Sequence, residues 1–230
     1  MKRYLITGAS RGIGRAIAEK LAAEDVTLLL HGRDTVALAE VYKAVKPRCG
    51  GVVRLIHDLA IKAGVSDLIA AVGSDPLDLL VNNAGIAIVK PFGEITSVEW
   101  EQTLGVNVTA PFLLTQRFAP KMPPGASIVN ILSIAAKTGF PNWSAYCMSK
   151  FALEGFSQSV REELHEHKIR VINIYPAATN TEIWKNVEGD WPRNKMISAE
   201  QVASAIVYAL SRPADVTVEN ITLSSAAGNL

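Results

Sequence analysis

Short apolar runs alternate with segments of helical periodicity along the whole chain, and this pattern limits the folds that it can adopt. The runs lack the polar alternation of half-exposed strands, so each predicts a strand buried on both faces of a sheet. Buried strands that alternate with helices are typical of a parallel sheet with right-handed crossovers. We therefore predict an α/β fold class: a doubly wound, mostly parallel, seven-stranded sheet with helices on both faces, in three α/β/α layers. The strands are expected at 4–6, 26–30, 52–56, 77–81, 128–132, 171–175 and 216–223, and the helices at about 13–21, 36–45, 61–72, 98–119, 145–165 and 198–210.

The composition is that of an ordinary globular protein and excludes several classes of function. Of the 230 residues, 49% are apolar and 20% charged, with a formal net charge of +1. No linker, charge block or repeat interrupts the sequence, so one domain over residues 1–230 is predicted. No basic stripe indicates a nucleic-acid partner. No apolar run is long enough to span a bilayer, and the first residues do not form a secretory signal, so we expect a cytoplasmic protein without a membrane partner.

The cysteines and histidines do not form a metal-binding pattern. Cys49 and Cys147 are isolated in the sequence, which predicts no disulfide and fits a reducing compartment. His165 and His167 are two residues apart on a predicted helix, so their side chains point to different faces. No metal site is expected.

Small and polar residues follow most of the predicted strands. In a doubly wound sheet, ligands bind beyond the carboxyl ends of the strands, near the point where the strand order reverses. We therefore expect the functional site at this edge of the sheet. The residues that follow the runs there are Thr7, Gly32, Asp58, Asn82, Ser133 and Pro176.

The turn TGASRGIG, residues 7–14, lies between the first predicted strand and the first predicted helix. Glycines at Gly8, Gly12 and Gly14 permit positive φ and a close approach of backbone to a ligand, and the free N–H groups at a helix start attract phosphate. No Lys-Ser or Lys-Thr pair follows, which disfavours a nucleoside triphosphatase loop. A tight turn that needs glycine only for packing is the alternative, but the strand-turn-helix context favours a dinucleotide site.

The end of the second strand bears on the choice between NAD and NADP. An NAD site places a carboxylate there for the ribose 2′-hydroxyl, whereas an NADP site supplies cations for the 2′-phosphate. Arg33 follows this strand, and Arg11 lies in the glycine turn, so two guanidinium groups can hold one phosphate. We predict NADP(H). If the strand ended two residues later, Asp34 would instead be the ribose carboxylate of an NAD site.

Tyr146 and Lys150 are four residues apart on a predicted helix and therefore lie on one face. A lysine cation about 4 Å away favours the phenolate, so we expect the pKa of Tyr146 to fall toward neutrality, where the phenol exchanges protons with a substrate oxygen. The alternative is an ordinary helix with a buried tyrosine and a solvated lysine.

Five features in order resemble the short-chain dehydrogenases/reductases over essentially the whole chain: TGASRGIG, the NNAG of residues 82–85, Asn107, Ser133 and Tyr146-x-x-x-Lys150. The resemblance implies a Rossmann-like fold and hydride transfer between a nicotinamide and a carbonyl or alcohol carbon. It makes Tyr146 the general acid/base and Lys150 the residue that lowers its pKa and binds the nicotinamide ribose. Ser133 would then hydrogen-bond the reacting oxygen, and Asn107 would hold a helix bend and a proton-relaying water.

The same resemblance implies the contacts with the cofactor. Asp58 would bind the adenine amino group, and residues 83–85 would lie beside the adenine ribose. Ala177 departs from the family pattern, which has glycine there, and this leaves the placement of Thr181, expected at the nicotinamide carboxamide, open. The predicted cofactor-binding residues are Gly8, Ser10, Arg11, Gly12, Ile13, Gly14, Arg33, Asp58, Leu59, Asn83, Ala84, Gly85, Tyr146, Lys150, Pro176, Thr179 and Thr181.

The predicted function is NADP(H)-dependent reduction of a small, hydrophobic carbonyl substrate. An NAD-dependent alcohol dehydrogenase of the same fold and a non-catalytic dinucleotide sensor or scaffold are the alternatives. The stretch 179–191, with Ile183, Trp184 and Trp191, is either a lid over the site or packs into the core or a neighbouring subunit. The family resemblance also implies a homodimer or homotetramer, formed through the helix that carries Tyr146 and the helix before it.

Overall fold

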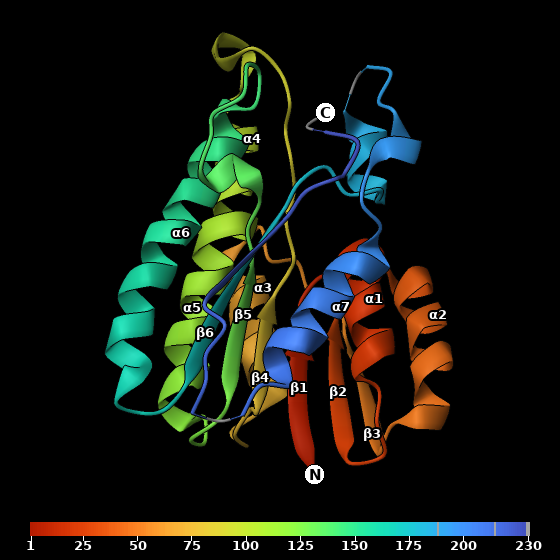
Figure 1. The fold of residues 1–230 in the computed structure, drawn as a ribbon, viewed down its shortest axis with the longest axis vertical. Coiled ribbons are helices and arrows are strands. Elements are labelled where there is room, and N and C mark those ends of the chain that lie inside the picture. The colour runs from red at the N-terminus through yellow and green to blue at the C-terminus, as the bar shows by residue number, and fades with distance from the viewer. Residues whose placement is uncertain (188, 214, 229–230) are drawn as a thin grey trace.

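In a computed structural model, which describes residues 1–187, 189–213 and 215–228, the chain forms one parallel sheet of seven strands between two layers of helices (Figure 1). The strand order is β3-β2-β1-β4-β5-β6-β7, so the order reverses beside β1. The predicted α/β fold class is confirmed, and the sheet is parallel in every strand pair rather than mostly parallel. The strands are β1 (Lys2–Ile6), β2 (Val26–His31), β3 (Gly51–Leu55), β4 (Leu79–Asn82), β5 (Ser127–Ile131), β6 (Arg170–Pro176) and β7 (Asn220–Leu223).

Each face of the sheet has its own hydrophobic core, which explains why the strands read as continuous apolar runs. In β2, Leu28 and Leu30 belong to one core, whereas Leu29 between them belongs to the other. Successive side chains of a strand point to opposite faces, so a strand covered on both sides needs apolar residues at every position. Helices α1 (Gly12–Leu21), α2 (Thr35–Val45) and α7 (Ala199–Leu210) cover the first face, and α3 (Lys62–Val72), α5 (Ala110–Phe118) and α6 (Ser144–His165) cover the second.

The helix predicted over 98–119 is divided, as its glycine and proline indicated. It forms α4 (Ser97–Leu104), a π-helical turn over Gly105–Thr109, and α5. A methyl group on Gly105 would lie 2.4 Å from the Ala60 carbonyl oxygen, so only glycine allows this close approach. Pro111 lies in the first turn of α5, directly after the π-helical turn, and has no N–H to donate to the preceding turn of the same continuous helix.

Most strand boundaries lie within one residue of the sequence-based prediction, and three differ by more: β1 starts at Lys2 rather than Tyr4, and the starts of β4 and β7 also differ. The strand β4 starts at Leu79 rather than Leu77, and β7 starts at Asn220 rather than Val216. The Val216 N–H donates instead to the Pro213 carbonyl (3.0 Å), which makes a turn before β7. Apolar residues that precede a strand in a loop are not distinguished from strand residues by periodicity.

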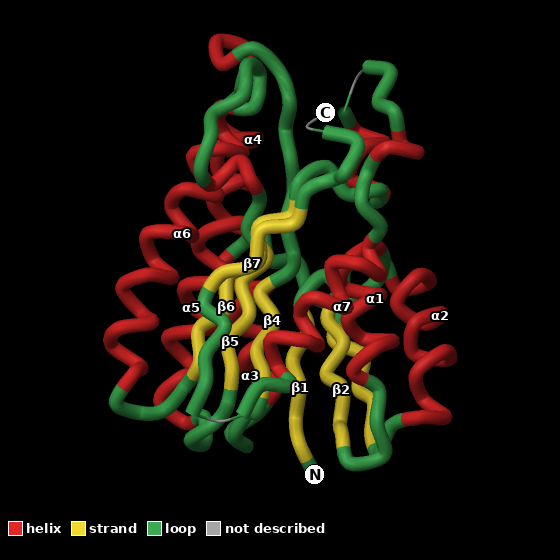
Figure 2. Tube along the Cα trace, in the orientation of Figure 1, coloured by secondary structure: helices red, strands yellow, loops and turns green. Residues whose placement is uncertain are grey.

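The long connections lie at one end of the sheet. Figure 2 shows the chain after β4 and the chain after β6 rising beyond the same end, on the carboxyl side of the strands. The start of α1 also lies at this end. None of the described helices is long and apolar enough to cross a membrane.

Candidate active site

A cavity of about 440 Å³ lies at the carboxyl ends of the strands, and most of the predicted site residues line it. It extends from the glycine turn, across the ends of β2, β4 and β5, to α6 and the chain after β6. Of the predicted residues, Gly14 and Asn107 are not part of its lining. The predicted residues that do line it are Gly8, Ser10, Arg11, Gly12, Ile13, Arg33, Asp58, Leu59, Asn83, Ala84, Gly85, Ser133, Tyr146, Lys150, Pro176, Thr179 and Thr181.

The glycine turn is built for close backbone packing against the chain after β4. Gly8 has a φ of +64°, and a methyl group on it would lie 2.9 Å from the Ala84 Cα atom. A methyl group on Gly14 would lie 2.2 Å from the Gly8 carbonyl oxygen. Gly14 therefore allows α1 to start against the turn, and it contributes to the site without lining the cavity.

Side chains hold this turn on the end of β4. The Thr7 hydroxyl donates to the Val81 carbonyl (3.0 Å) and accepts from the Asn83 and Ala84 N–H groups (2.9 and 3.0 Å). The Asn83 amide donates to the Thr7 and Gly8 carbonyls (2.8 and 3.1 Å). No described side chain caps the start of α1. These uncapped N–H groups beside a cavity fit the phosphates of a dinucleotide.

His31 is a structural residue of this region that the sequence analysis did not assign to the site. It is the last residue of β2 and is 2% exposed, and burial lowers its pKa to about 4, so the imidazole is neutral. Its Nδ1 accepts from the Gly8 N–H (3.3 Å), which leaves the proton on Nε2 to be donated to the His57 carbonyl (3.1 Å). A histidine at the end of an otherwise apolar strand was the signal for this role.

The end of β2 places two arginines and two aspartates at the cavity. The strand ends at His31, and Asp34 caps α2 by accepting from the Ala37 N–H (3.0 Å). Arg11 lies 4.0 Å from the Asp34 carboxylate, and Arg33 lies 3.5 Å from the Asp58 carboxylate. Both arginine side chains are 58% exposed, so these ion pairs are weak and the guanidinium groups are accessible to an anion.

Helix α6 brings Tyr146 and Lys150 to the cavity on one face, as their spacing predicted. Lys150 is 4% exposed, and its ammonium donates to the Ile131 carbonyl at the end of β5 (2.8 Å). The ammonium lies 5.6 Å from the centre of the Tyr146 ring. Burial lowers the pKa of Lys150 to about 8, because the charged form loses its hydration. Lys150 is therefore a buried lysine, and the alternative of a solvated lysine is wrong.

The pKa of Tyr146 lies above its ordinary value, contrary to the lowering expected from the sequence. Burial raises the pKa of Tyr146 to about 12, although a hydrogen bond with the Ser133 side chain lowers it. The cost of burying a phenolate outweighs the effect of its neighbours. At neutral pH the phenol is thus protonated, which suits a group that gives a proton away.

Asn107 lies behind the cavity, in the π-helical turn between α4 and α5, and is fully buried. Its carboxamide accepts from the Ile86 N–H (2.9 Å) and donates to the Ile86 carbonyl (2.9 Å) and the Ser149 hydroxyl (2.9 Å). Ser149 in turn donates to the Tyr146 carbonyl (2.7 Å). The side chain of Asn107 therefore joins the chain after β4 to the helix that carries Tyr146.

A row of aromatic rings extends outward from Tyr146. Trp143 contacts Tyr146 edge-on at 5.5 Å between ring centres, and Trp184 contacts Trp143 at 5.8 Å and Trp191 at 4.8 Å. The Trp184 indole N–H donates to the Thr179 carbonyl (2.9 Å), which fixes the ring. The aromatic residues of the stretch 179–191 thus pack against Trp143 of the same chain and line the cavity, together with Phe140. Residue 188 of this stretch lies outside the described residues.

Ala177 does not disturb the chain after β6. Among the described residues, the non-glycine positions with positive φ are Asn142 and Lys168, so the backbone at Ala177 has no need of glycine. Its N–H donates to the Leu223 carbonyl (2.8 Å). Thr181 lines the cavity beside the glycine turn. A methyl group added to Gly12 would lie 3.1 Å from the Thr181 side chain, so the two residues are close neighbours. The Arg193 guanidinium donates to the Thr181 carbonyl (2.7 Å).

The comparisons with known proteins agree with this geometry. The family model for short chain dehydrogenases matches residues 2–191. L-xylulose reductase of Mesocricetus auratus is 32% identical over 94% of this chain and 91% of its own length, and carbonyl reductase [NADPH] 2 of Sus scrofa is 31% identical over 91% and 88%. The crystal structure of the angucycline C-6 ketoreductase LanV with bound NADP superposes with a TM-score of 0.84 at 28% identity, over 96% of this chain and 93% of that chain.

A glycine turn packed on the end of β4, a buried lysine and a phenol at one cavity, and a family model that spans most of the sequence lead to the same assignment. The chain belongs to the short-chain dehydrogenase family.

Proposed function

We propose that this protein reduces a hydrophobic ketone or aldehyde with NADP(H) as the hydride donor. The observation that carries the proposal is the convergence of Ser133, Tyr146 and Lys150 on the same cavity as the glycine turn. Carbonyl reduction needs a hydride donor and a proton donor beside the same carbonyl group. The glycine turn suits a dinucleotide that donates hydride, and the Tyr146 phenol, which lines the same cavity, can donate the proton. When bound, the nicotinamide supplies the hydride.

The side chains divide the remaining work between them. Tyr146 is protonated at neutral pH and donates its proton to the substrate oxygen. Ser133 holds the same oxygen as negative charge develops on it. Lys150, whose pKa is about 8, is charged in most molecules at neutral pH and stabilises the phenolate that remains. Asn107 keeps α6 in register with the chain after β4.

Two observations support NADP rather than NAD. A carboxylate that binds the ribose of NAD stands at the end of the second strand. Asp34 lies beyond the end of β2, and its carboxylate is engaged in capping the start of α2. Arg11 and Arg33 are both accessible at that edge of the cavity. Two guanidinium groups fit the 2′-phosphate of NADP.

The aromatic rings support a hydrophobic substrate that contains an aromatic or other flat group. Trp143, Trp184, Trp191 and Phe140 all line the part of the cavity near Tyr146. Such rings offer large apolar area at low conformational cost and stack well on a planar ligand.

The test is the consumption of NADPH and of NADH, followed by absorbance, over a panel of aryl ketones, aliphatic ketones, aldehydes and the corresponding alcohols. We expect turnover of aryl ketones with NADPH and at least tenfold lower kcat/KM with NADH. Arg33→Ala should reduce this preference, whereas Arg48→Ala, an exposed arginine at the other end of the sheet, should not. Preference for NADH with alcohols would establish the dehydrogenase alternative. Tight NADPH binding without turnover of any member of the panel would favour a sensor or scaffold.

A further inference from the structure

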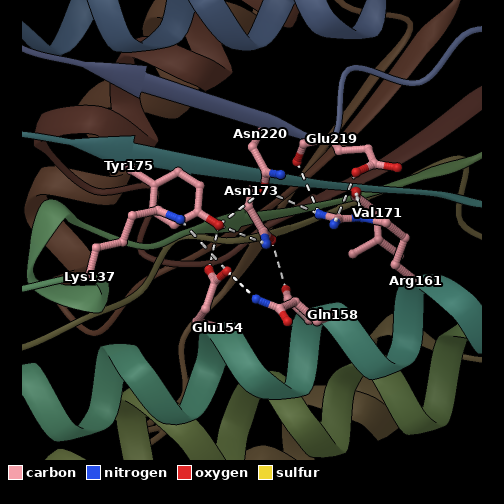
Figure 3. A network of polar contacts seen from close by, with 10 residues as sticks. Lys137, Glu154, Gln158, Arg161, Val171, Asn173, Tyr175, Glu219 and Asn220 are labelled. Atoms are coloured by element: carbon pink, nitrogen blue, oxygen red, sulfur yellow. Dashed lines mark hydrogen bonds and ion pairs between the residues drawn. The ribbon is translucent and has the colours of Figure 1, made fainter.

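A second buried polar network lies further along the face of α6 that carries Tyr146 and Lys150, between α6 and the sheet, and the proposed reaction does not use it (Figure 3). Glu154 is one helical turn beyond Lys150 and is 9% exposed. Its carboxylate accepts a hydrogen bond from the Tyr175 hydroxyl and a second one from the Gln158 amide (2.7 Å). A carboxylate buried to this extent is costly unless its partners are well placed.

A chain of hydrogen bonds extends from this carboxylate deep into the sheet. The Asn173 amide donates to the Tyr175 oxygen (3.3 Å), and the Ser157 hydroxyl donates to the Asn173 oxygen (2.7 Å). The Asn130 amide donates to Ser157, and the Asn82 amide donates to Asn130 (2.8 Å). All these side chains are buried, and they come from β4, β5, β6 and α6.

Every donor in this chain points toward Glu154. The Tyr175 hydroxyl has one hydrogen and two acceptors in reach, the Glu154 carboxylate and the Asn220 Oδ1 (3.0 Å). A carboxylate can only accept, so the hydrogen goes to Glu154, and each following group must then accept from the next. The last member is left with an unpaired atom, because the Asn82 Oδ1 is buried without a hydrogen-bond partner among the described residues. The acceptor end of the chain at Glu154 therefore sets the direction of every hydrogen bond in it, and the unpaired oxygen at Asn82 is the cost at the far end.

The network joins the segments that carry the reacting groups. Tyr175 is followed by Pro176 and the chain that lines the cavity. Lys137 lies 4.0 Å from the Glu154 carboxylate and 4.3 Å from the centre of the Tyr175 ring. It directly follows the short helix Ile134–Ala136, which Ser133 precedes as its N-cap. Glu154 thus connects α6, the segment after Ser133 and the end of β6.

We propose that Glu154, acting through Tyr175, is a positioning residue for the reaction: it sets the distance of Ser133 and of the chain after β6 from Tyr146 and Lys150. This inference rests on the proposed function. Lys150 joins α6 to β5 through the Ile131 carbonyl. Glu154 lies one turn further along and joins α6 to β6 closer to the cavity than Ser157 and Arg161, whose side chains also bond β6. The catalytic contacts themselves remain those of Ser133, Tyr146 and Lys150.

Three variants test the proposal. Glu154→Gln keeps the shape of the side chain and removes its charge, and Tyr175→Phe removes only the hydroxyl group. Glu163→Gln, an exposed position on the same helix, is the matched control. The measurements are kcat and KM for an aryl ketone, the Kd of NADPH by fluorescence titration, and amide hydrogen exchange of residues 133–137, 176–181 and 7–14.

We expect Glu154→Gln and Tyr175→Phe to lower kcat at least fivefold with the Kd of NADPH within twofold of the wild-type value. Exchange should become faster in residues 133–137 and 176–181 and stay unchanged in residues 7–14, and Glu163→Gln should match the wild type in every measurement. A kcat within twofold of wild type in both variants overturns the proposal, even if exchange becomes faster, because the network would then serve stability alone. Unchanged exchange in both segments overturns it as well.

The two proposals fail in distinguishable ways. If the wild type reduces no carbonyl compound, the proposed function has failed, and the exchange measurement alone then supports or overturns the role of Glu154 in placing the two segments. If Glu154→Gln does not fold, Tyr175→Phe decides the outcome, because it removes one hydroxyl group and retains the ring in its apolar surroundings with Leu132, Ala136 and Leu153.

Discussion

Tyr146 and Tyr175 are two phenols at the same helix, and they differ in what their hydroxyl groups can reach. Tyr146 lies on α6 and lines the cavity, whereas Tyr175 packs against α6 from β6 and is fully buried. Burial raises the pKa of both phenols. The Tyr175 hydroxyl donates to the Glu154 carboxylate, and this hydrogen bond raises the pKa of Tyr175 further. The hydrogen-bond partner of Tyr146 is instead the Ser133 side chain at the cavity.

The comparison teaches that a perturbed pKa does not by itself mark a catalytic group. Both tyrosines are more difficult to ionise than in water, and for the same first reason, desolvation. Only Tyr146 combines a transferable proton with access to a cavity and a lysine on the next turn of the helix. We therefore expect loss of activity from changes around Tyr146 and mainly loss of stability from changes deep in the network of Tyr175.

The largest expected effect is that of Tyr146→Phe. Removal of a general acid typically costs 10²- to 10⁴-fold, so kcat should fall by at least about 100-fold. The Kd of NADPH, measured by fluorescence titration, should remain within a fewfold of the wild-type value. Tyr175→Phe is the matched control, with the much smaller loss described above. If Tyr146→Phe keeps more than a tenth of the wild-type kcat, the contrast between the two phenols is broken.

The next effect is a dependence of stability on pH that belongs to Lys150. Its pKa is about 8 in the folded chain and 10.5 ordinarily, so between these values the unfolded chain binds more protons. The free energy of unfolding should therefore rise between pH 8 and pH 10 and fall again as the pH is lowered through 8. One pH unit in this range corresponds to about 1.4 kcal/mol, so the expected rise is about 2 kcal/mol. Above pH 10 the raised pKa values of the two tyrosines reverse the trend.

Urea unfolding of the wild type and of Lys150→Met at pH 7.5, 8.5 and 9.5 measures this effect. The methionine variant should lack the rise, because it has no buried ammonium to discharge. The difference between the two proteins isolates Lys150 from other groups that titrate in this range, such as Cys49, whose pKa burial raises. Parallel pH profiles would show that Lys150 is not desolvated in solution.

A smaller effect is expected from Ser157→Ala, in the middle of the network of Tyr175. The substitution leaves the amide of Asn130 and the oxygen of Asn173 without their partner, at a cost of about 1–3 kcal/mol in the free energy of unfolding. Ser159→Ala, at an exposed position on the same helix, is the control and should change stability by less than about 0.5 kcal/mol. Equal stability of the two variants would mean that the buried chain of hydrogen bonds contributes little.

The smallest effect concerns the rings that adjoin Tyr146. Trp184→Ala removes the ring that packs between Trp143 and Trp191, and aromatic pairs are worth about 0.5–1.5 kcal/mol beyond their area. We expect KM for aryl ketones to rise about fivefold, with little change for small aliphatic ketones. Trp100→Ala, on the exposed side of α4, should leave both values unchanged. A uniform rise for every substrate would argue for a role of Trp184 in shaping the cavity rather than in selecting its ligand.

The order of elements and the location of the site could be predicted from the sequence. Continuous apolar runs report burial on both faces, and in a parallel sheet the residues after the strands gather at one edge, so Gly8, Ser133 and Tyr146 come together. The i, i+4 spacing places Tyr146 and Lys150 on one face of α6 whatever surrounds that helix. These inferences hold because they depend on local geometry and on a period of the sequence.

The tertiary structure decided what those side chains experience. The pKa of Tyr146 rises because distant segments close around it, and no spacing along the sequence measures that burial. The tautomer of His31, the two contacts of Asn107 with Ile86, and the hydrogen bond from Tyr175 to Glu154 likewise join residues that are far apart in the chain. Periodicity determined which elements form and where their ends meet. Long-range packing decided which polar groups are buried and paired, because desolvation and hydrogen bonding depend on neighbours that only the folded chain brings together.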